Sequence, residues 1–113
     1  MIKIYGIKNC DSVKKALSFF KKNNLEFSLQ DFKTKPVDSS CIKHWLTQID
    51  MKLLFNSRST TYKTFKLKEL NLNDNEKIDW LSKQNLLIKR PVIEYKDKII
   101  IGFNEENYTK VFL

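Results

Sequence analysis

The feature that most constrains this chain is a strand that passes into a helix through a short polar turn containing a cysteine. Residues 2–4 alternate between apolar and polar types, which indicates a strand with one buried face. Apolar residues then recur with the i, i+3, i+4, i+7 spacing of a half-buried helix. These helix positions are Val13, Ala16, Leu17 and Phe20. Cys10 is therefore predicted to lie in the turn, near the first free backbone N–H groups of the helix.

This turn is a place where a cysteine can become reactive. The free N–H groups and the helix dipole favour a negative charge, and a thiolate is such a charge. The neighbouring carboxylate of Asp11 acts in the opposite direction, because it repels a thiolate. Two interpretations of Cys10 remain open at this point, a reactive nucleophile and a small apolar residue packed in a turn.

Length and composition are typical of one globular domain spanning residues 1–113. Hydrophobic residues make up 42% of the chain and charged residues 30%. No apolar run approaches the ~20 residues of a membrane-spanning helix, and no signal peptide is recognisable. The two cysteines, Cys10 and Cys41, are too few for a disulfide framework. We therefore expect a cytoplasmic monomer without membrane contact, in which Cys41 lies at the edge of the core.

Lysine and arginine differ sharply in number and distribution in this chain. The net charge is +8, but the lysines are scattered from Lys3 to Lys110 without forming a run, so we expect no direct nucleic-acid binding. Among the 21 basic residues the only arginines are Arg58 and Arg90. Arginine offers a planar pair of donors that lysine lacks. These two positions are thus candidates for anion binding, with a structural ion pair as the alternative.

The rest of the chain alternates between helix and strand patterns. The expected elements are a first helix to about residue 24, a strand around 27–29, a helix over about 39–50, a helix within 62–70, a helix opened by Asn73 and Glu76, strands over 92–95 and 98–101, and a last helix capped by Asn104. The first β-α-β unit can form a parallel strand pair. We predict an α/β fold, a thioredoxin-like four-stranded mixed sheet flanked by helices. A mainly helical insertion, about 39–87, precedes the C-terminal β-hairpin.

Four motifs in this order resemble the ArsC/Spx/YffB family, the arsenate-reductase-like branch of the thioredoxin superfamily. They are Tyr-Gly-Ile-Lys-Asn-Cys-Asp-Ser-Val-Lys-Lys-Ala (5–16), Phe-Asn-Ser-Arg-Ser-Thr-Thr-Tyr (55–62), Leu-Ile-Lys-Arg-Pro-Val-Ile (87–93) and Ile-Gly-Phe (101–103). The Lys-Asn-Cys-Asp turn is most similar to the YffB subgroup. The resemblance extends along essentially the whole chain.

The resemblance implies a role for five residues. Cys10 matches the family's nucleophilic cysteine, and Arg58 and Arg90 match arginines of an anion pocket around it. Asn9 belongs to the same turn and is assigned to that pocket. Pro91 matches a proline with a cis peptide bond that precedes a strand. The pocket would hold glutathione or another anion, and no metal is implied.

Two departures from the family pattern affect the expected function. Arsenate reductases of this family carry a further arginine after the last strand, whereas residues 102–107 here are acidic and contain none. Spx regulators usually carry Cys-x-x-Cys in the first turn, whereas Val13 occupies the second position here. Arsenate reduction and a disulfide switch in the turn are therefore both disfavoured.

The leading functional prediction is a glutathione-dependent thiol–disulfide reductase or transferase with Cys10 as its single nucleophile. Glutathione would be the co-substrate, and a second glutathione would resolve the mixed disulfide. The alternative is a Spx-like transcriptional regulator that binds RNA polymerase. Arsenate reduction ranks below both.

Overall fold

The computed structural model describes residues 1–113, and its contacts divide the chain into two compact units. The first unit consists of Met1–Asp31 and Arg90–Leu113, and the second consists of Phe32–Lys89. The chain leaves the first unit after its second strand and returns to it just before the C-terminal hairpin. A single domain over 1–113, with an insertion at about 39–87, stays a prediction.

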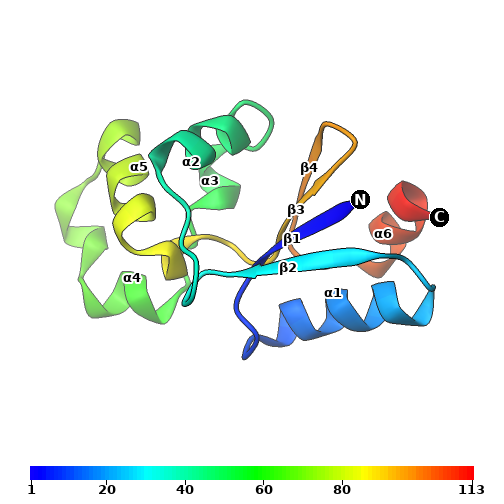
Figure 1. Ribbon diagram of the computed structural model, residues 1–113. Coiled ribbons are helices and arrows are strands. Elements are labelled where there is room, and N and C mark those ends of the chain that lie inside the picture. Colours follow the sequence, from blue (N-terminus) through cyan, green and yellow to red (C-terminus); the bar gives the residue numbers. More distant parts are fainter. The chain divides into compact units, whose positions relative to one another are not determined.

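The first unit contains a four-stranded mixed sheet. Its strands are β1 (Ile2–Gly6), β2 (Phe27–Asp31), β3 (Val92–Tyr95) and β4 (Lys98–Ile101). The spatial order is β2-β1-β3-β4, with β1 parallel to β2 and antiparallel to β3 (Figure 1). This is the thioredoxin-like α/β sheet that the sequence predicted, and both hairpin strands have the predicted bounds.

Two helices of the first unit, α1 (Asp11–Lys22) and α6 (Glu105–Phe112), share one apolar core with the sheet. The buried residues of this core are Ile2, Ile4, Ala16, Phe19, Phe20, Ile93, Ile100, Tyr108 and Phe112. Aromatic rings join the two helices, since Phe20 stacks on Tyr108 at 5.7 Å and meets Phe112 edge-on at 5.0 Å. The predicted helix face was nearly complete, but it omitted Phe19 and included Leu17, which is only partly buried.

Local turn and cap chemistry fixes the ends of the C-terminal elements. Lys96 and Asp97 join β3 to β4 with φ angles of 46° and 62°, as in the tight turns that suit the twist of a hairpin. Asn104 caps α6, because its side chain accepts a hydrogen bond from the N–H of Asn107 at 2.9 Å. Both features follow from residues that are neighbours in sequence.

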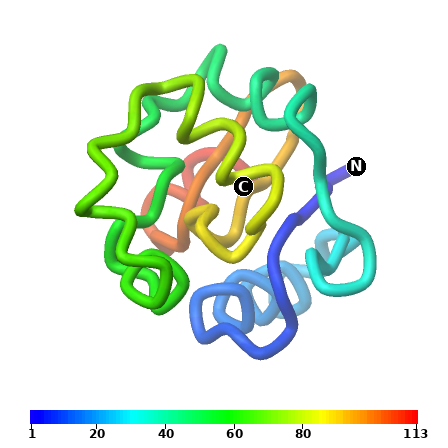
Figure 2. Tube along the Cα trace, turned by 90° about the vertical axis from the view of Figure 1, so that its left-hand side faces the viewer, coloured from blue at the N-terminus to red at the C-terminus, as the bar shows by residue number.

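The second unit is built from short helices joined by tight turns, coloured from cyan through green to yellow in Figure 2. They are α2 (Ser39–Leu46), α3 (Met51–Leu54), α4 (Thr60–Thr64), η1 (Leu67–Leu70), α5 (Asp74–Lys83) and η2 (Asn85–Leu87). Ile42 and Trp45 of α2 and Leu81 of α5 are completely buried in this unit. The predicted capping box at the start of α5 is confirmed, with Asn73 and Glu76 bonding each other's backbone N–H groups at 2.8 and 3.0 Å.

Two predicted helices of this unit were wrong in extent. The helix expected over 39–50 ends at Leu46, and Asp50, in extended conformation, begins the separate helix α3. The helix expected within 62–70 is two pieces, α4 and η1, separated by Lys66 with φ of 52°. A left-handed residue interrupts the helical hydrogen-bond ladder, so an apolar pattern continued through it does not give one helix.

A buried asparagine connects distant parts of the second unit. The side-chain oxygen of Asn85 accepts from the N–H of Val37 at 2.8 Å, and its amide nitrogen donates to the carbonyl oxygens of Val37 and Leu81 at 3.1 and 2.8 Å. These bonds hold the segment before α2 against the end of α5. None of the helices is long and apolar enough to cross a membrane.

Candidate functional site

The pairing of the strands places one end of each of the four strands of the first unit at the same end of the sheet. Gly6 at the end of β1 pairs with Asp31 at the end of β2. Tyr5, next to Gly6, pairs with Val92, the first residue of β3, so Pro91 precedes β3 at this same end of the sheet. Gly102 closes the row, since its N–H donates to the carbonyl oxygen of Pro91 at 2.8 Å. The turn that carries Cys10 leaves from this end of the sheet.

Cys10 is the N-cap residue of α1. Its backbone is extended, with φ of −141° and ψ of 126°, and its carbonyl oxygen accepts the first helical bond from the N–H of Lys14 at 2.9 Å. The thiol makes no capping hydrogen bond, and Cys10 is partly exposed and not in a disulfide. Asp11, the neighbouring acidic residue, is the first helical residue and is exposed. The thiol is thus available for chemistry beside the free N–H groups of the first helical turn.

The turn around Cys10 is held by contacts on both sides. The N–H of Lys8 donates to the Oδ2 of Asp31 at 3.2 Å, which ties the turn to the end of β2. A Cβ added to Gly6 would lie 2.7 Å from the Cγ2 of Val13, so only glycine allows the strand end to approach the first turn of α1 this closely. The sequence analysis missed Asp31, because only the parallel pairing of β1 with β2 brings its carboxylate to the turn before Cys10.

Asn9, Arg90 and Pro91 also belong to this end of the first unit. Asn9 is exposed within the turn, and Arg90 is partly exposed and precedes Pro91, the residue before β3. The Arg90–Pro91 bond is cis, which confirms the expectation drawn from the resemblance. Three of the four residues assigned to the anion pocket therefore lie at the same sheet end as Cys10.

Arg58 lies in the second unit, in the turn before α4. Its backbone N–H donates to the Oδ1 of Asn56 at 3.1 Å, and its side chain is exposed. The next residue, Ser59, is buried and caps α4 by accepting from the N–H of Tyr62 at 3.1 Å. The turn is thus locally ordered by side-chain caps. A shared pocket of Arg58 with Cys10 stays a prediction.

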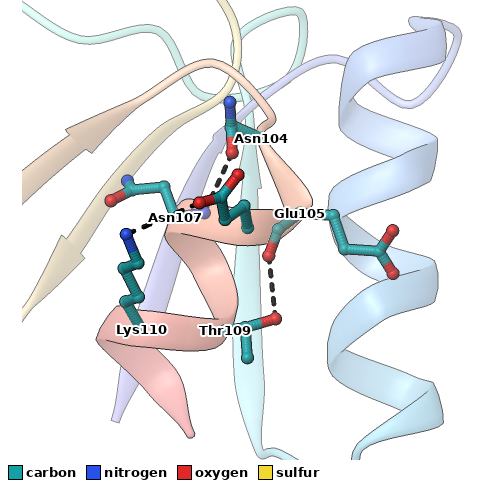
Figure 3. A network of polar contacts seen from close by, with 6 residues as sticks. Asn104, Glu105, Asn107, Thr109 and Lys110 are labelled. Atoms are coloured by element: carbon teal, nitrogen blue, oxygen red, sulfur yellow. Dashed lines mark hydrogen bonds and ion pairs between the residues drawn. The ribbon is translucent and has the colours of Figure 1, made fainter.

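The acidic segment after β4 forms the start of α6 (Figure 3). Glu105 and Glu106 occupy its first turn, where the helix dipole favours negative charge. Glu106 also pairs with Lys110 at 3.6 Å, and both side chains are mostly exposed. The segment 102–107, expected from its sequence to be acidic and without arginine, is thus the capped and negatively charged start of a helix.

Gly102, between β4 and this helix, is held in a special conformation. Its φ of 74° lies in the left-handed region that favours glycine. Its carbonyl oxygen accepts a hydrogen bond from the buried hydroxyl of Tyr108. The segment that follows the sheet edge is therefore fixed to α6. No group of three or more His, Cys, Asp or Glu side chains is arranged to hold a metal ion.

Comparison with known proteins agrees with this geometry. The model of the ArsC family matches residues 5–111. A protein of Haemophilus influenzae is 39% identical over 113 residues, with 99% of each chain covered. The global transcriptional regulator Spx 1 of Lactococcus lactis is 27% identical over 108 residues, which cover 94% of this chain and 84% of that protein.

Solved structures show the same fold. A YffB protein superposes with a TM-score of 0.93 at 24% identity, with 100% of both chains covered. A chain described as a possible arsenate reductase from Streptococcus mutans gives a TM-score of 0.80 at 26% identity, covering 96% of this chain and 98% of that one. The relatives of this chain thus include a protein named as a Spx regulator, by sequence, and one described as a possible arsenate reductase, by structure. With its family model matched over residues 5–111, the chain belongs to the ArsC family.

Proposed function

We propose that this protein is a glutathione-dependent thiol–disulfide reductase or transferase in which Cys10 is the only nucleophile. The observation that carries this proposal is the state of the Cys10 thiol. It lies at the N-terminus of a twelve-residue helix, is partly exposed, and takes no part in capping that helix. A helix N-terminus stabilises the thiolate, which is the reactive form.

The reaction has two exchange steps. The Cys10 thiolate attacks the glutathione sulfur of a mixed disulfide, a Cys10–glutathione disulfide forms, and the substrate leaves as a thiolate that takes a proton from water. The thiolate of a second glutathione then attacks the glutathione sulfur bound to Cys10. Oxidised glutathione leaves and the Cys10 thiolate is restored. In total, each mixed disulfide consumes one free glutathione, whose sulfur pairs with the glutathionyl sulfur taken from the substrate to give oxidised glutathione, and the substrate is released as a thiol.

A single-cysteine scheme fits the packing of the first helical turn. The position three residues after Cys10, where a two-cysteine enzyme would carry its resolving thiol, is Val13. Val13 is completely buried and packs against Gly6. The other cysteine, Cys41, belongs to the second unit and forms no disulfide. An external thiol is therefore the natural resolving group.

The role that we propose for the two arginines is to bind the carboxylates of glutathione. Glutathione carries two carboxylates, and arginine binds a carboxylate through two parallel hydrogen bonds. Arg90, beside the cysteine turn, and Arg58 would each bind one of them, with Asn9 and the backbone near Pro91 orienting the tripeptide.

Turnover with a small glutathione mixed disulfide tests the assignment of Cys10. Wild type is compared with Cys10→Ser and with Cys41→Ser, a matched control that removes the other cysteine. We expect Cys10→Ser to be inactive and Cys41→Ser to retain wild-type activity. Activity that survives in Cys10→Ser, or a wild-type protein as inactive as that variant, contradicts the proposal.

Replacing each arginine by lysine tests the anion pocket, because lysine keeps the positive charge but lacks the planar pair of donors. A charge-assisted hydrogen bond contributes about 1.5–3 kcal/mol, or roughly 10- to 100-fold in affinity. Arg58→Lys and Arg90→Lys should weaken glutathione binding, measured by isothermal titration, by about that factor with little change in melting temperature. Unchanged glutathione affinity in both folded variants would remove the arginine pocket from the proposal.

A second candidate function is a Spx-like regulator that binds RNA polymerase. It is favoured by 27% identity to a Spx regulator over 94% of the chain. Binding to purified RNA polymerase, with Cys10→Ser as a comparison, distinguishes the two functions, because a regulator would bind without turning over disulfides. Arsenate reduction ranks last, since the segment 102–107 places two glutamates where the reductases carry an arginine.

A further inference from the structure

The second unit contains a cavity that the proposed thiol chemistry does not use. Its volume is about 490 Å³, within the range of small-molecule sites. Phe55, Tyr62, Leu67 and other apolar residues form part of the wall, and Lys52, Lys68 and Lys77 contribute three ammonium groups. All lining residues belong to Phe32–Lys89, and neither Cys10 nor either arginine is among them.

The wall of this cavity carries three lysines and no acidic residue. The acidic residue Glu69 lines an adjoining cavity that shares Lys68 with this one. None of its three lysines forms an ion pair with a carboxylate, in contrast to Lys83 and Lys110, which pair with Asp79 and Glu106. Asn71 and Ser57, also in the wall, add neutral hydrogen-bonding groups. The wall therefore matches an anion carrying more than one negative charge.

Lys77 distinguishes this cavity from the lysine-rich surface in general. Lys3 and Lys77 are the only lysines of the chain that are not exposed. The Nζ of Lys3 also lies over an aromatic ring, 4.9 Å from the centroid of Tyr5, but the hydroxyl of that ring donates to the Glu94 carboxylate at 2.8 Å. The Nζ of Lys77 instead lies 5.6 Å from the ring centroid of Phe55, whose ring meets Tyr62 edge-on at 5.9 Å. A partly buried ammonium group held on an aromatic ring, without a carboxylate, gains most from a bound anion.

We propose that this cavity binds a phosphorylated small molecule of mononucleotide size that has an apolar or aromatic part. Three lysines and no arginine suit a phosphate group, because an ammonium acts as a point charge whereas a carboxylate is best matched by arginine's planar fork. The apolar wall, with Phe55 and Tyr62, contacts the rest of the ligand. This inference goes beyond the proposed thiol chemistry and does not depend on it.

The test uses ADP as the probe, with pyrophosphate and adenosine representing its two parts. Binding is followed by isothermal titration and by amide chemical shifts of the isotope-labelled full chain. We expect ADP to bind more tightly than either part and to shift amides of Lys52, Lys68 and Lys77, leaving those of β4 unchanged. Lys77→Met keeps the apolar stem on Phe55 but removes the charge, and should weaken ADP binding about 10-fold.

Two further variants control this result. Lys68→Met changes an exposed side chain of the cavity, so it should weaken ADP binding without affecting folding. Lys83→Met removes the same charge from α5 outside the cavity, and should bind ADP as wild type does. If millimolar ADP and pyrophosphate leave the Lys68 and Lys77 amides unshifted, or if Lys83→Met weakens binding as much as Lys77→Met, the proposal is overturned.

Glutathione is the necessary competitor in these titrations. Glutathione that displaces ADP from wild type and loses its own affinity in Lys77→Met would assign the cavity to the thiol co-substrate and overturn a separate phosphate site. ADP binding should persist in Cys10→Ser, and glutathione turnover should persist in Lys77→Met. Loss of turnover in Cys10→Ser tests the thiol chemistry alone, so the two proposals fail independently.

Discussion

Replacing Gly6 by alanine should show how tightly the end of β1 is fitted to the helix that follows Cys10. The added Cβ would lie 2.7 Å from the Cγ2 of Val13, well inside the 3.5–4.0 Å of a favourable carbon contact. Val13 is completely buried and belongs to the first turn of α1, so it cannot turn away from the new methyl group without disturbing the core.

The magnitude follows from two opposing effects. An extra methyl group in a packed core costs about 1–3 kcal/mol. The lower entropy of the unfolded alanine variant returns about 0.4–1 kcal/mol. We expect Gly6→Ala to lower the free energy of unfolding by about 1–2 kcal/mol, which corresponds to a melting temperature roughly 4 °C or more below that of wild type.

Val13→Ala provides the matched control. It removes both γ-methyl groups and leaves the Cβ of residue 13 at 3.8 Å from the Cβ added at Gly6, an ordinary contact. Alone it should cost about 2 kcal/mol through lost burial and the cavity created. The double variant should then cost about the same 2 kcal/mol, instead of the sum of about 3–4 kcal/mol.

Urea denaturation of wild type, both single variants and the double variant measures the coupling directly. Costs that add within about 0.5 kcal/mol would refute a direct Gly6–Val13 contact as the cause. Alkylation of Cys10 in the same four proteins reports whether the turn moves. We expect a changed rate in Gly6→Ala and recovery towards the wild-type rate in the double variant.

Three further variants test other contacts. Tyr108→Phe removes the hydrogen bond to Gly102 and should lower the free energy of unfolding, measured by urea denaturation, by about 1–2 kcal/mol. Because burial raises the pKa of Tyr108, wild type should lose stability as the pH rises above about 10. If Tyr108→Phe shows the same loss at high pH, the loss does not come from Tyr108. Asn85→Ala leaves three buried backbone groups unpaired and should cost at least about 2 kcal/mol by the same measurement, so a cost near zero would show that these bonds are dispensable. The hydrogen bond from the N–H of Cys41 holds the pKa of the Asp38 carboxyl below its usual value. The stabilising effect of the Asp38 carboxylate is therefore present above that usual value and is lost as the pH falls through the lowered pKa. Asp38→Asn should reduce the loss of stability at acid pH, and an unchanged loss would assign it to other carboxylates.

The sequence determined the features that depend on neighbouring residues. Two short apolar runs separated by two polar residues located β3 and β4, and the capping residues located the starts of α5 and α6. Cys10 could be assigned to the N-terminus of a helix because a strand pattern, a polar turn and a helical pattern follow one another within twenty residues. These features depend on residues only a few positions apart, and contacts of that range leave a recognisable pattern in the sequence.

Only the tertiary structure decided the features that depend on distant residues. The left-handed conformation of Lys66 divides a continuous apolar pattern into two helical pieces. The side-chain oxygen of Asn85 accepts a hydrogen bond from Val37, 48 positions away, and no residue pattern near Asn85 predicts this bond. Asp31 comes to the turn before Cys10 through the parallel pairing of β1 and β2. Such contacts arise from strand register and packing between elements, and the local pattern of residue types carries no record of either.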